Sequence, residues 1–317
     1  MQYIKLERAN IEISKIAFGA QRFENAKNHE EHVETILHAY KKGINFFDTA
    51  VLYCEDQSEI ILGKAIKEMK KGDLPFYISS KCLDGDHNNF RKRLETSLKR
   101  LNLDSLDFFT CFWGVKSFLD WEGVKSFGAL KEMEKAKEEG LIKHICITTH
   151  MKNEDLKKVV KDYPFDINIV GYNLINSKAR IDGLKASYES GISNISMNPL
   201  GTGIIPQFKE VFDVIKIREN QTLVQAAYDY LLSNPYIHSV LGGFSNKKHV
   251  DDAVFALENH VPYSKEEIQL IDKKVRKKIN TIPLEKRYEI AMELCKKMYI
   301  LRDEVAEFMN VYPMRIW

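Results

Sequence analysis

The 317-residue sequence has few cysteines, and their arrangement fits neither a disulfide framework nor a structural zinc site. The five are odd in number, widely spread and never in C-x-x-C spacing: Cys54, Cys82, Cys111, Cys146 and Cys295. Such a pattern is typical of reduced thiols in a cytoplasmic protein. We therefore expect a cytoplasmic protein whose fold does not depend on disulfides.

Long hydrophobic runs are also missing. No apolar stretch is long enough to span a bilayer, and Met1–Arg8 contains no signal-peptide core. The 47 Lys+Arg and 45 Asp+Glu residues leave a formal net charge of +2, which gives no reason to expect a nucleic acid or a membrane as partner. With 44% hydrophobic and 29% charged residues, the composition excludes collagen and disorder. We expect neither of these partners, and a monomer or weak oligomer.

Several catalytic and nucleotide-binding signatures are absent as well. Neither G-x-S-x-G nor a Walker A motif occurs. The segment Gly201–Gly203 followed by Pro206 is a near miss to G-x-G-x-x-G, but the proline and the late position argue against a Rossmann motif. The segment His29–His32 differs from H-E-x-x-H and lies at a polar helix start, which favours a solvated face over a metal site. We expect no metal.

What the sequence does contain is a regular alternation of short apolar runs and helical segments. The runs are nearly continuous, as in parallel strands that are buried on both faces. They are Lys15–Gly19, Ile44–Asp48, Phe76–Ser80, Leu106–Cys111, His144–Thr148, Ile167–Asn173, Asn194–Met197 and Ser239–Leu241.

Helical periodicity lies between these runs. Val33, Ile36, Leu37 and Tyr40 form one apolar stripe, and Phe90, Leu94, Leu98 and Leu101 form another. A glycine suited to the left-handed position after a helix precedes an apolar residue three times, at Gly43, Gly140 and Gly191.

The count of eight strand–helix units predicts a (β/α)₈ TIM barrel that spans residues 1–317 as one domain. An open doubly wound sheet is the alternative fold. Tyr3–Leu6 and Ile11–Ile13 are expected to form a hairpin that closes the barrel bottom. Ser264–Lys278 and Leu284–Met309 are expected to be helices of a C-terminal extension over about 264–317.

Three polar side chains are expected at the same rim of this barrel, because active sites of such barrels form at the C-terminal strand ends. Asp48 and Tyr53 follow the second strand, and Lys81 follows the third. A nearby lysine charge lowers the pKa of a tyrosine, and a carboxylate keeps that lysine charged and oriented. The alternative is a structural Asp–Lys pair with Tyr53 only packing nearby.

The sequence resembles the aldo-keto reductases. The resemblance lies in Gly43–Ala50 with Tyr53, Ser58-Glu59 and Leu62-Gly63, and continues through Ser80-Lys81, Leu101–Asp107, Gly140–Thr149, Tyr172-Asn173, Pro199–Gly201 and Gly242–Ser245. It covers nearly the whole chain in order. Thr148–His150 and Met197–Leu200 look most like the bacterial branch that often carries a C-terminal iron–sulfur module, although Cys295 is the only cysteine in that region here.

The resemblance implies a barrel that binds NADP, or NAD, across its top and transfers hydride to a carbonyl carbon, with an activated C=C or C=N bond as the acceptor if the reaction differs from the family's. It makes Tyr53 the proton donor, tuned by Asp48 and Lys81. The family's strand-4 histidine falls on Phe112, which cannot donate a hydrogen bond to the substrate. This departure has three interpretations. Another group such as His150 replaces the missing histidine, or the reaction itself differs and can be a non-redox elimination or isomerisation. In the third, the protein is a nicotinamide-binding regulatory subunit with little turnover.

The resemblance also assigns cofactor and substrate positions. Thr148 and Thr149 replace the usual carboxamide-binding pair, and Met197 takes the position that often stacks on nicotinamide, or packs in the core. A small apolar or aromatic substrate is expected. The remaining cofactor positions are Gly19, Ala20, Asp48, Asn198, Leu200, Gly201, Thr202, Gly203, Gly243, Ser245, Lys248 and Asp252, and the substrate positions are Phe112, Trp113, Trp121 and His150.

Overall fold

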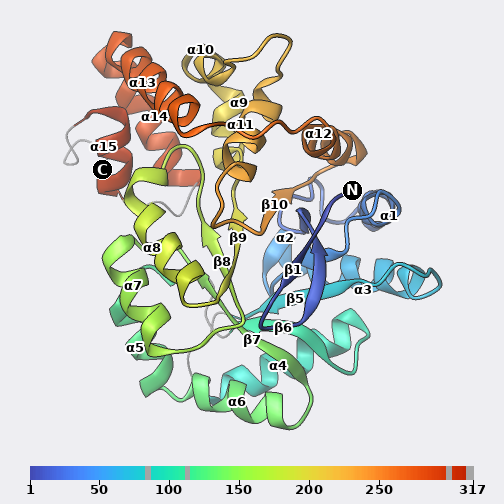
Figure 1. Ribbon diagram of the computed structural model, residues 1–317. Helices are drawn as coiled ribbons and strands as arrows, with labels where there is room; N and C mark the ends of the chain where they lie inside the picture. The colour runs from blue at the N-terminus through green and yellow to red at the C-terminus, as the bar shows by residue number, and fades with distance from the viewer. Residues whose placement is uncertain (83–86, 111–114, 298–301, 312–317) are drawn as a thin grey trace.

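Eight parallel strands close into a barrel in the computed structural model, which describes residues 1–82, 87–110, 115–297 and 302–311 (Figure 1). The order around the barrel is β10-β3-β4-β5-β6-β7-β8-β9. The closed order confirms the TIM barrel and excludes the open sheet. The strands are β3 (Ile16–Gly19), β4 (Phe46–Asp48), β5 (Tyr77–Lys81), β6 (Leu106–Thr110), β7 (Ile142–Thr149), β8 (Ile167–Gly171), β9 (Ser193–Met197) and β10 (Ser239–Gly243).

Helices connect the strands and cover the outside of the barrel. They are α1 (His29–Lys41), α2 (Tyr53–Asp56), α3 (Ser58–Met69), α4 (His87–Leu101), α5 (Phe118–Ser126), α6 (Ala129–Glu138), α7 (Asn153–Asp162), α8 (Ser177–Glu189), α9 (Ile204–Gln207), α10 (Lys209–Phe212), α11 (Leu223–Leu232) and α12 (Lys247–Glu258), with short 3₁₀ turns at Gly201–Gly203 and Asp213–Ile215. Gly43, Gly140 and Gly191 follow α1, α6 and α8 with φ of +92°, +76° and +76°, which confirms the repeated helix-to-strand turn.

Two apolar layers hold the barrel together, because successive side chains of a strand point to opposite faces. Phe46 and Phe108 lie inside the barrel with ring centroids 5.5 Å apart. Their neighbours Phe47 and Phe109 point outward into the helix layer. The same alternation places every second residue at the C-terminal strand ends toward the barrel interior.

The N-terminal hairpin closes one end of the barrel. Strands β1 (Tyr3–Leu6) and β2 (Ile11–Ser14) pair antiparallel. Leu6 and Ile13 are fully buried and belong to the same apolar cluster as Ala17 and Phe46 inside the barrel. The expected hairpin is therefore confirmed, and it lies at the end opposite to the C-terminal strand ends.

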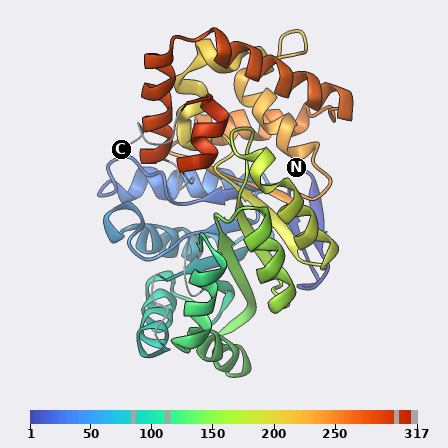
Figure 2. The same cartoon turned by 90° about the vertical axis from the view of Figure 1, so that its left-hand side faces the viewer.

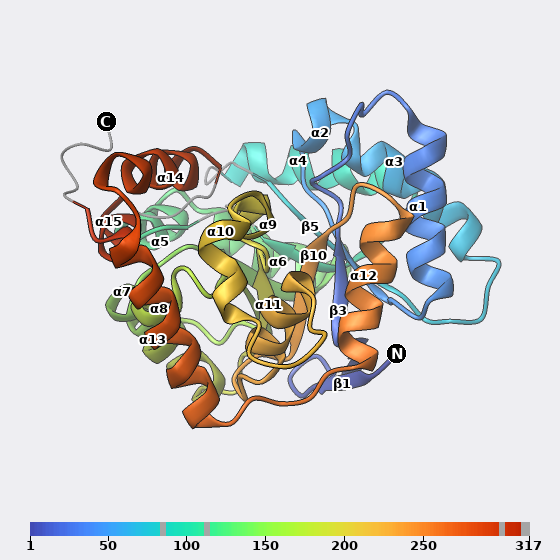
Figure 3. The same cartoon turned by 90° about the horizontal axis from the view of Figure 1, so that it is seen from above.

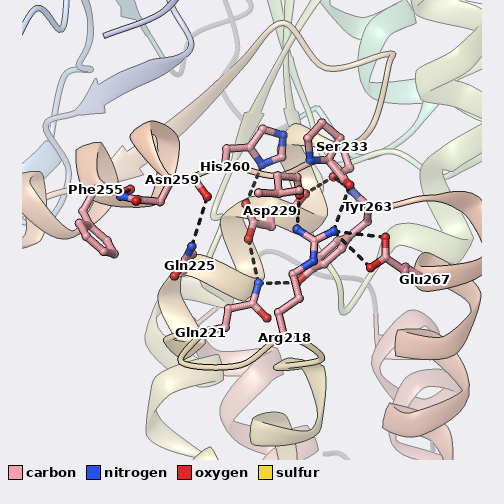
Figure 4. A network of polar contacts seen from close by, with 12 residues as sticks. Arg218, Gln221, Gln225, Asp229, Ser233, Phe255, Asn259, His260, Tyr263 and Glu267 are labelled. Carbon is pink, nitrogen blue, oxygen red and sulfur yellow. Dashed lines mark hydrogen bonds and ion pairs between the residues drawn. The ribbon is translucent and has the colours of Figure 1, made fainter.

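A polar network ties the segment between α12 and α13 (Lys265–Thr281) to the barrel helix α11 (Figure 4). His260 Nδ1 lies 2.6 Å from Asp229 Oδ1 of α11, and Ser233 Oγ accepts a hydrogen bond from the Tyr263 backbone N–H at 2.7 Å. The Arg218 guanidinium stacks 4.4 Å from the centroid of the Tyr263 ring. These contacts fix the position of the first residues of α13 on the barrel. The helices that follow α13 are therefore attached at the same place.

The C-terminal helices gather at one end of the molecule (Figures 2 and 3). The segment Leu284–Met309 was expected to be helical throughout, and the structure describes two helices in it, α14 (Leu284–Lys297) and α15 (Arg302–Met309). Within the described ranges, no helix has both the length and the apolar character that crossing a bilayer requires.

Candidate active site

The interior side chains at the C-terminal strand ends form one ring, which we call the rim layer. Each lies two residues beyond an interior residue of its strand. From β3 to β10 its members are Gly19, Asp48, Lys81, Thr110, Thr148, Gly171, Met197 and Gly243. Three positions are glycine and four carry polar groups on neighbouring strands. The rim layer therefore has a part without side chains, at the three glycines, and a polar half on the four neighbouring strands. We call its surface the floor of the barrel mouth.

Asp48 and Lys81 form a buried ion pair in the polar half of the rim layer. The Lys81 ammonium donates to both carboxylate oxygens of Asp48 at 2.5 and 2.6 Å, and to the Thr49 carbonyl at 3.0 Å. Only 2% of the Lys81 side chain and 5% of the Asp48 side chain are exposed. All three ammonium protons thus have acceptors, which fixes the charge in place.

Tyr53 lies at the same rim, with its ring centroid 5.5 Å from the Lys81 ammonium. It belongs to a turn with an uncommon backbone, since Leu52, Cys54, Glu55 and Asp56 have φ between +54° and +65°. Residues with side chains adopt this left-handed region rarely and at an energetic cost. A turn of this kind persists only when its surroundings hold it.

Asp56 supplies that support. Its carboxylate accepts the Leu52 backbone N–H at 3.0 Å and two hydrogen bonds from the Arg100 guanidinium, each of 2.7 Å. The hydrogen bonds from Arg100 hold the pKa of Asp56 below its ordinary value. Arg100 belongs to α4, so a helix of the outer layer braces the turn that carries Tyr53.

The first rim strand is tied to the same turn. Ala20 is buried, its backbone N–H donates to the Asp48 carbonyl at 2.8 Å, and its carbonyl accepts from Ser58 Oγ at 2.5 Å. A Cβ at Gly19 would lie 3.2 Å from the Gly242 carbonyl oxygen, so the neighbouring strand leaves little room there. The backbone at residues 19 and 20 is therefore held rigidly beside Asp48.

Thr148 and Thr149 face opposite sides of β7. Thr148 points inward, and its buried hydroxyl has no hydrogen-bond partner among the described residues. Thr149 points outward and donates to Asn168 Oδ1 at 2.9 Å in the helix layer. The expected pair is thus corrected, because alternation along the strand leaves only Thr148 directed at the barrel mouth.

The loop after β9 carries several residues in left-handed conformations. Asn198, Thr202 and Gly203 have φ of +61°, +55° and +91°, and a Cβ at Gly203 would meet no atom within 4 Å. Met197 at the end of β9 is half-buried and packs on the interior cluster. Leu200 is half-buried too and packs against the outer apolar layer. The loop therefore offers exposed backbone beside the glycine part of the rim.

The end of β10 brings a cation over the rim. A Cβ at Gly243 would lie 2.6 Å from Arg22 Cγ, so the Arg22 side chain crosses the floor at this glycine. Burial raises the pKa of the Cys54 thiol, and the Arg22 charge is among the groups that oppose the rise. The aliphatic part of the Arg22 side chain therefore lies at the end of β10, and its positive charge acts on the turn that carries Tyr53.

The first turn of α12 lies beyond Gly243. Asn246 caps this helix by accepting the His249 N–H at 3.0 Å, and the Ser245 N–H reaches His249 Nδ1 at 3.4 Å. Lys248 pairs with Asp252 at 2.6 Å on the exposed face of the helix. Two of the expected cofactor residues are thus engaged with each other in the structure.

Comparison with known proteins identifies the family. The family model "Aldo/keto reductase family" matches residues 15–276. The chain is 25% identical over 279 residues to L-galactose dehydrogenase of Arabidopsis thaliana, covering 80% of this chain and 86% of the relative. It is 28% identical over 218 residues to methylglyoxal reductase DkgA of Escherichia coli O157:H7, covering 68% and 72%.

Solved structures show the same fold. The holo form of aldo-keto reductase AKR11C1 from Bacillus halodurans superposes with a TM-score of 0.73 at 19% identity, over 86% of this chain and 96% of the other. The chain belongs to the aldo/keto reductase family. It is therefore an oxidoreductase that depends on a nicotinamide cofactor.

The rim of this aldo/keto reductase fits such a cofactor. The buried hydroxyl of Thr148 points to the barrel mouth and has no hydrogen-bond partner among the described residues. An amide group at the mouth would form a hydrogen bond with it. The glycine part of the floor leaves space for a flat ring. The Arg22 guanidinium and the N-terminus of α12 supply positive potential for phosphates beside Gly243.

Two of the predicted substrate residues, Phe112 and Trp113, lie outside the described residues. A third, Trp121, was assigned wrongly to the substrate wall. It is buried, its Nε1 donates to Asp162 of α7 at 2.6 Å, and its ring packs edge-on against Phe165 at 5.1 Å. Trp121 therefore belongs to the barrel flank.

His150 is placed at the mouth. The backbone ladder continues beyond β7, since the His150 N–H donates to the Val115 carbonyl at 2.7 Å, so His150 follows Cys146 and Thr148 on the interior face. Three charged residues around the mouth were missed from the sequence, namely Arg22, Arg180 and Glu304. None lies within a recognisable local motif.

A cavity of about 710 Å³ lies elsewhere, between α8, α11, α13 and α15 on the outside of the barrel. Tyr172, Tyr230 and Asp272 contribute to its lining. Tyr172 follows β8 with its hydroxyl turned to Asn234 in the outer layer. The cavity therefore lies outside the rim layer, and Glu304 of α15 is among the residues that line it.

Proposed function

We propose that this aldo/keto reductase reduces a carbonyl group, or an activated C=C or C=N bond, of a small apolar or aromatic compound with NADPH, or with NADH. The observation that carries the proposal is the constellation of Asp48, Lys81 and Tyr53 at one rim. The Lys81 charge is held by two carboxylate hydrogen bonds and lies 5.5 Å from the centre of the tyrosine ring.

The chain's own residues then have separate tasks. Lys81 stabilises the phenolate that remains when Tyr53 gives up its hydroxyl proton to the substrate oxygen. Asp48 and the Thr49 carbonyl keep the ammonium charged and immobile, so little reorganisation accompanies the proton transfer. The nicotinamide cofactor, when bound, supplies the hydride. Burial of the ion pair keeps water away from both of its charges.

Cofactor binding is assigned to the rest of the rim. Thr148 is positioned for the carboxamide, and Met197 for packing on the nicotinamide ring. The backbone of Gly201–Gly203 and of Gly243–Ser245, with Arg22, is positioned for the pyrophosphate. Lys248 and Asp252 on α12 are positioned for the adenosine end. Gly19 and Ala20 are positioned for the ribose beside Asp48.

Two relatives are named L-galactose dehydrogenase and methylglyoxal reductase, after oxidation of an alcohol and reduction of a carbonyl compound. Both agree with carbonyl–alcohol chemistry at this rim. Phe112 and Trp113, at the position of the strand-4 histidine and beside it, favour an apolar or aromatic substrate. Because Phe112 cannot donate a hydrogen bond, non-redox chemistry and a regulatory nicotinamide-binding role are the alternatives.

The proposal is tested by titrating the purified protein with NADPH and NADH, followed by tryptophan fluorescence. NADPH absorbance at 340 nm is then recorded with a panel of aromatic and aliphatic carbonyl compounds. We expect saturable binding and oxidation of NADPH by at least one compound. Binding without oxidation across the panel would favour the regulatory role. Product formation in the absence of any nicotinamide would favour elimination or isomerisation, and absence of binding would contradict the proposal.

A further inference from the structure

A second buried ion pair joins the C-terminal helix α15 to the barrel helix α8. Arg180 donates through Nε and Nη2 to the two carboxylate oxygens of Glu304 at 2.9 and 2.7 Å, and through Nη1 to the Gly171 carbonyl at 2.5 Å. The exposed fractions of the two side chains are 0% and 1%. A charge pair buried this deeply costs desolvation, and apolar residues of similar size often replace such pairs without loss of stability. The pair therefore holds two charges at one place at a cost in desolvation free energy.

The same arginine lies beside His150 at the rim. Gly171 is the rim member on β8 and has no side chain. A Cβ there would lie 2.6 Å from His150 Nδ1 and 2.8 Å from Arg180 Nη1. The imidazole and the guanidinium thus occupy together the space that any other residue at position 171 would fill. A residue without a side chain is therefore required at position 171 for the imidazole and the guanidinium to lie where they do.

This environment sets the protonation of the imidazole. Burial lowers the pKa of His150 well below its ordinary value, and the charges of Arg180 and Lys116 lower it further. Lys152, two residues along the chain, is paired with Asp303 of α15. His150 is therefore neutral, with one ring nitrogen a donor and the other an acceptor. Nδ1 is the ring nitrogen near the guanidinium at Gly171, and a proton on Nε2 leaves the lone pair of Nδ1 on the side of that positive charge.

We propose that Arg180 and Glu304 are positioning residues that hold His150 as a neutral hydrogen-bond donor toward the substrate oxygen, so that the C-terminal helix completes the active site. The proposal rests on the proposed function and deepens it. Position 112 is a phenylalanine, so a donor at the end of β7 supplies what that position lacks. Glu304 neutralises Arg180 and fixes its orientation, and the oriented guanidinium lies beside the imidazole at Gly171.

The test replaces the charge pair and keeps the packing, in the double variant Arg180→Met/Glu304→Met. A matched control, Lys178→Met/Glu307→Met, removes the exposed ion pair between the same two helices. The first readout is the titration of the His150 ring by ¹³C NMR, assigned with His150→Gln. The others are kcat with NADPH and 4-nitrobenzaldehyde, and the dissociation constant of NADPH. Circular dichroism and thermal unfolding establish that each variant is folded.

The proposal predicts that the titration midpoint of His150 rises in the Arg180/Glu304 double variant. Arg180 lowers the pKa of His150 and has its Nη1 beside the ring, whereas Glu304 binds Nε and Nη2, so the loss of the arginine charge outweighs the loss of the carboxylate. The proposal also predicts that kcat falls about tenfold, as expected for one lost oriented hydrogen bond, with NADPH affinity unchanged. The Lys178/Glu307 control leaves all three quantities at their wild-type values. An unchanged midpoint or an unchanged kcat in the Arg180/Glu304 variant overturns the proposal, because the pair is then only structural.

If the double variant does not fold, Arg180→Lys takes its place. Lysine keeps the charge but loses the bidentate contact and the planar group beside His150. We then expect His150 to stay neutral while kcat falls, and retention of the wild-type kcat overturns the proposal.

The proposed function and the present inference can fail independently of each other. Wild-type protein that does not bind NADPH contradicts the proposed function, whereas normal binding and turnover with an insensitive Arg180–Glu304 pair contradicts only the present inference.

Discussion

Lys81 donates hydrogen bonds to both carboxylate oxygens of Asp48 and places its ammonium group over the ring of Tyr53. The carboxylate and the ammonium come from adjacent strands of the barrel, β4 and β5, whose C-terminal ends share one rim. Because almost nothing of the pair is exposed, each charge depends on the other for compensation. The chemistry of the site and the stability of the barrel mouth are therefore coupled.

The variant Lys81→Met leaves the Asp48 carboxylate buried without its cation. We expect a loss of about 3–5 kcal/mol in the free energy of unfolding, measured by urea denaturation, together with loss of turnover. The double variant Asp48→Leu/Lys81→Met removes both charges. It should regain most of the stability and none of the activity. A double variant as unstable as the single one would show that the pair is not the source of the loss.

Arg22 is expected to contribute to dinucleotide binding through the pyrophosphate, because its side chain crosses the rim at Gly243 and its charge reaches the Tyr53 turn. Arg22→Met should raise the dissociation constants of NADPH and NADH alike, by about fivefold for one exposed charge contact. Fluorescence titration checks this, with Lys273→Met on the exposed face of α13 as control. A loss restricted to NADPH would assign Arg22 to the 2′-phosphate instead.

The pairing of Lys248 with Asp252 is expected to limit the preference for NADPH. Asp252→Asn removes the competing carboxylate and releases Lys248 for a 2′-phosphate. NADPH affinity should then rise about threefold while NADH affinity stays constant. Isothermal titration with both dinucleotides measures the ratio. If both affinities fall together, Asp252 contacts the adenosine directly and Lys248 does not read the phosphate.

His150 should make folding stability sensitive to acid. Its pKa is lowered in the folded protein, so below about pH 6.5 the unfolded chain binds a proton that the folded chain does not. Stability from this residue is present above that pH and is lost as the pH falls. Between pH 7.5 and 5.5, the free energy of unfolding should fall more in the wild type than in His150→Gln, as measured by urea denaturation. His238 shifts in the same direction but is present in both proteins. Equal losses would contradict the neutral, buried imidazole.

Most of the barrel could be predicted from the sequence because its strands are buried on both faces and read as apolar runs. The bounds were wrong where polar residues lie at the strand ends. For instance, β7 begins at Ile142, and the exposed Lys143 interrupts the apolar pattern. The rim positions of Asp48 and Lys81 followed from the rule that such sites form at C-terminal strand ends, and the structure brings the two together.

The rest of the site depends on contacts without a local signature. Arg180 and Glu304 are 124 positions apart, and nothing in either neighbourhood points to the other. Trp121 was misassigned because an aromatic residue after strand β6 suits a substrate wall and a packed flank equally well. Only Asp162 and Phe165, which approach from another helix and loop, decide between them. Successive side chains of β7 point alternately into and out of the barrel. The sequence does not show which of them point inward, so the outward direction of Thr149 could not be predicted.

The central claim is that Tyr53 gives its proton to the substrate beside Lys81, whose charge stabilises the phenolate that remains. It is tested most directly by single-turnover oxidation of bound NADPH in Tyr53→Phe, followed at 340 nm with the best carbonyl substrate of the wild type. We predict NADPH affinity within about twofold of the wild type, as for an interaction made only in the transition state, and oxidation slowed by about 100-fold or more, as for loss of a general acid. Oxidation at the wild-type rate would contradict the account.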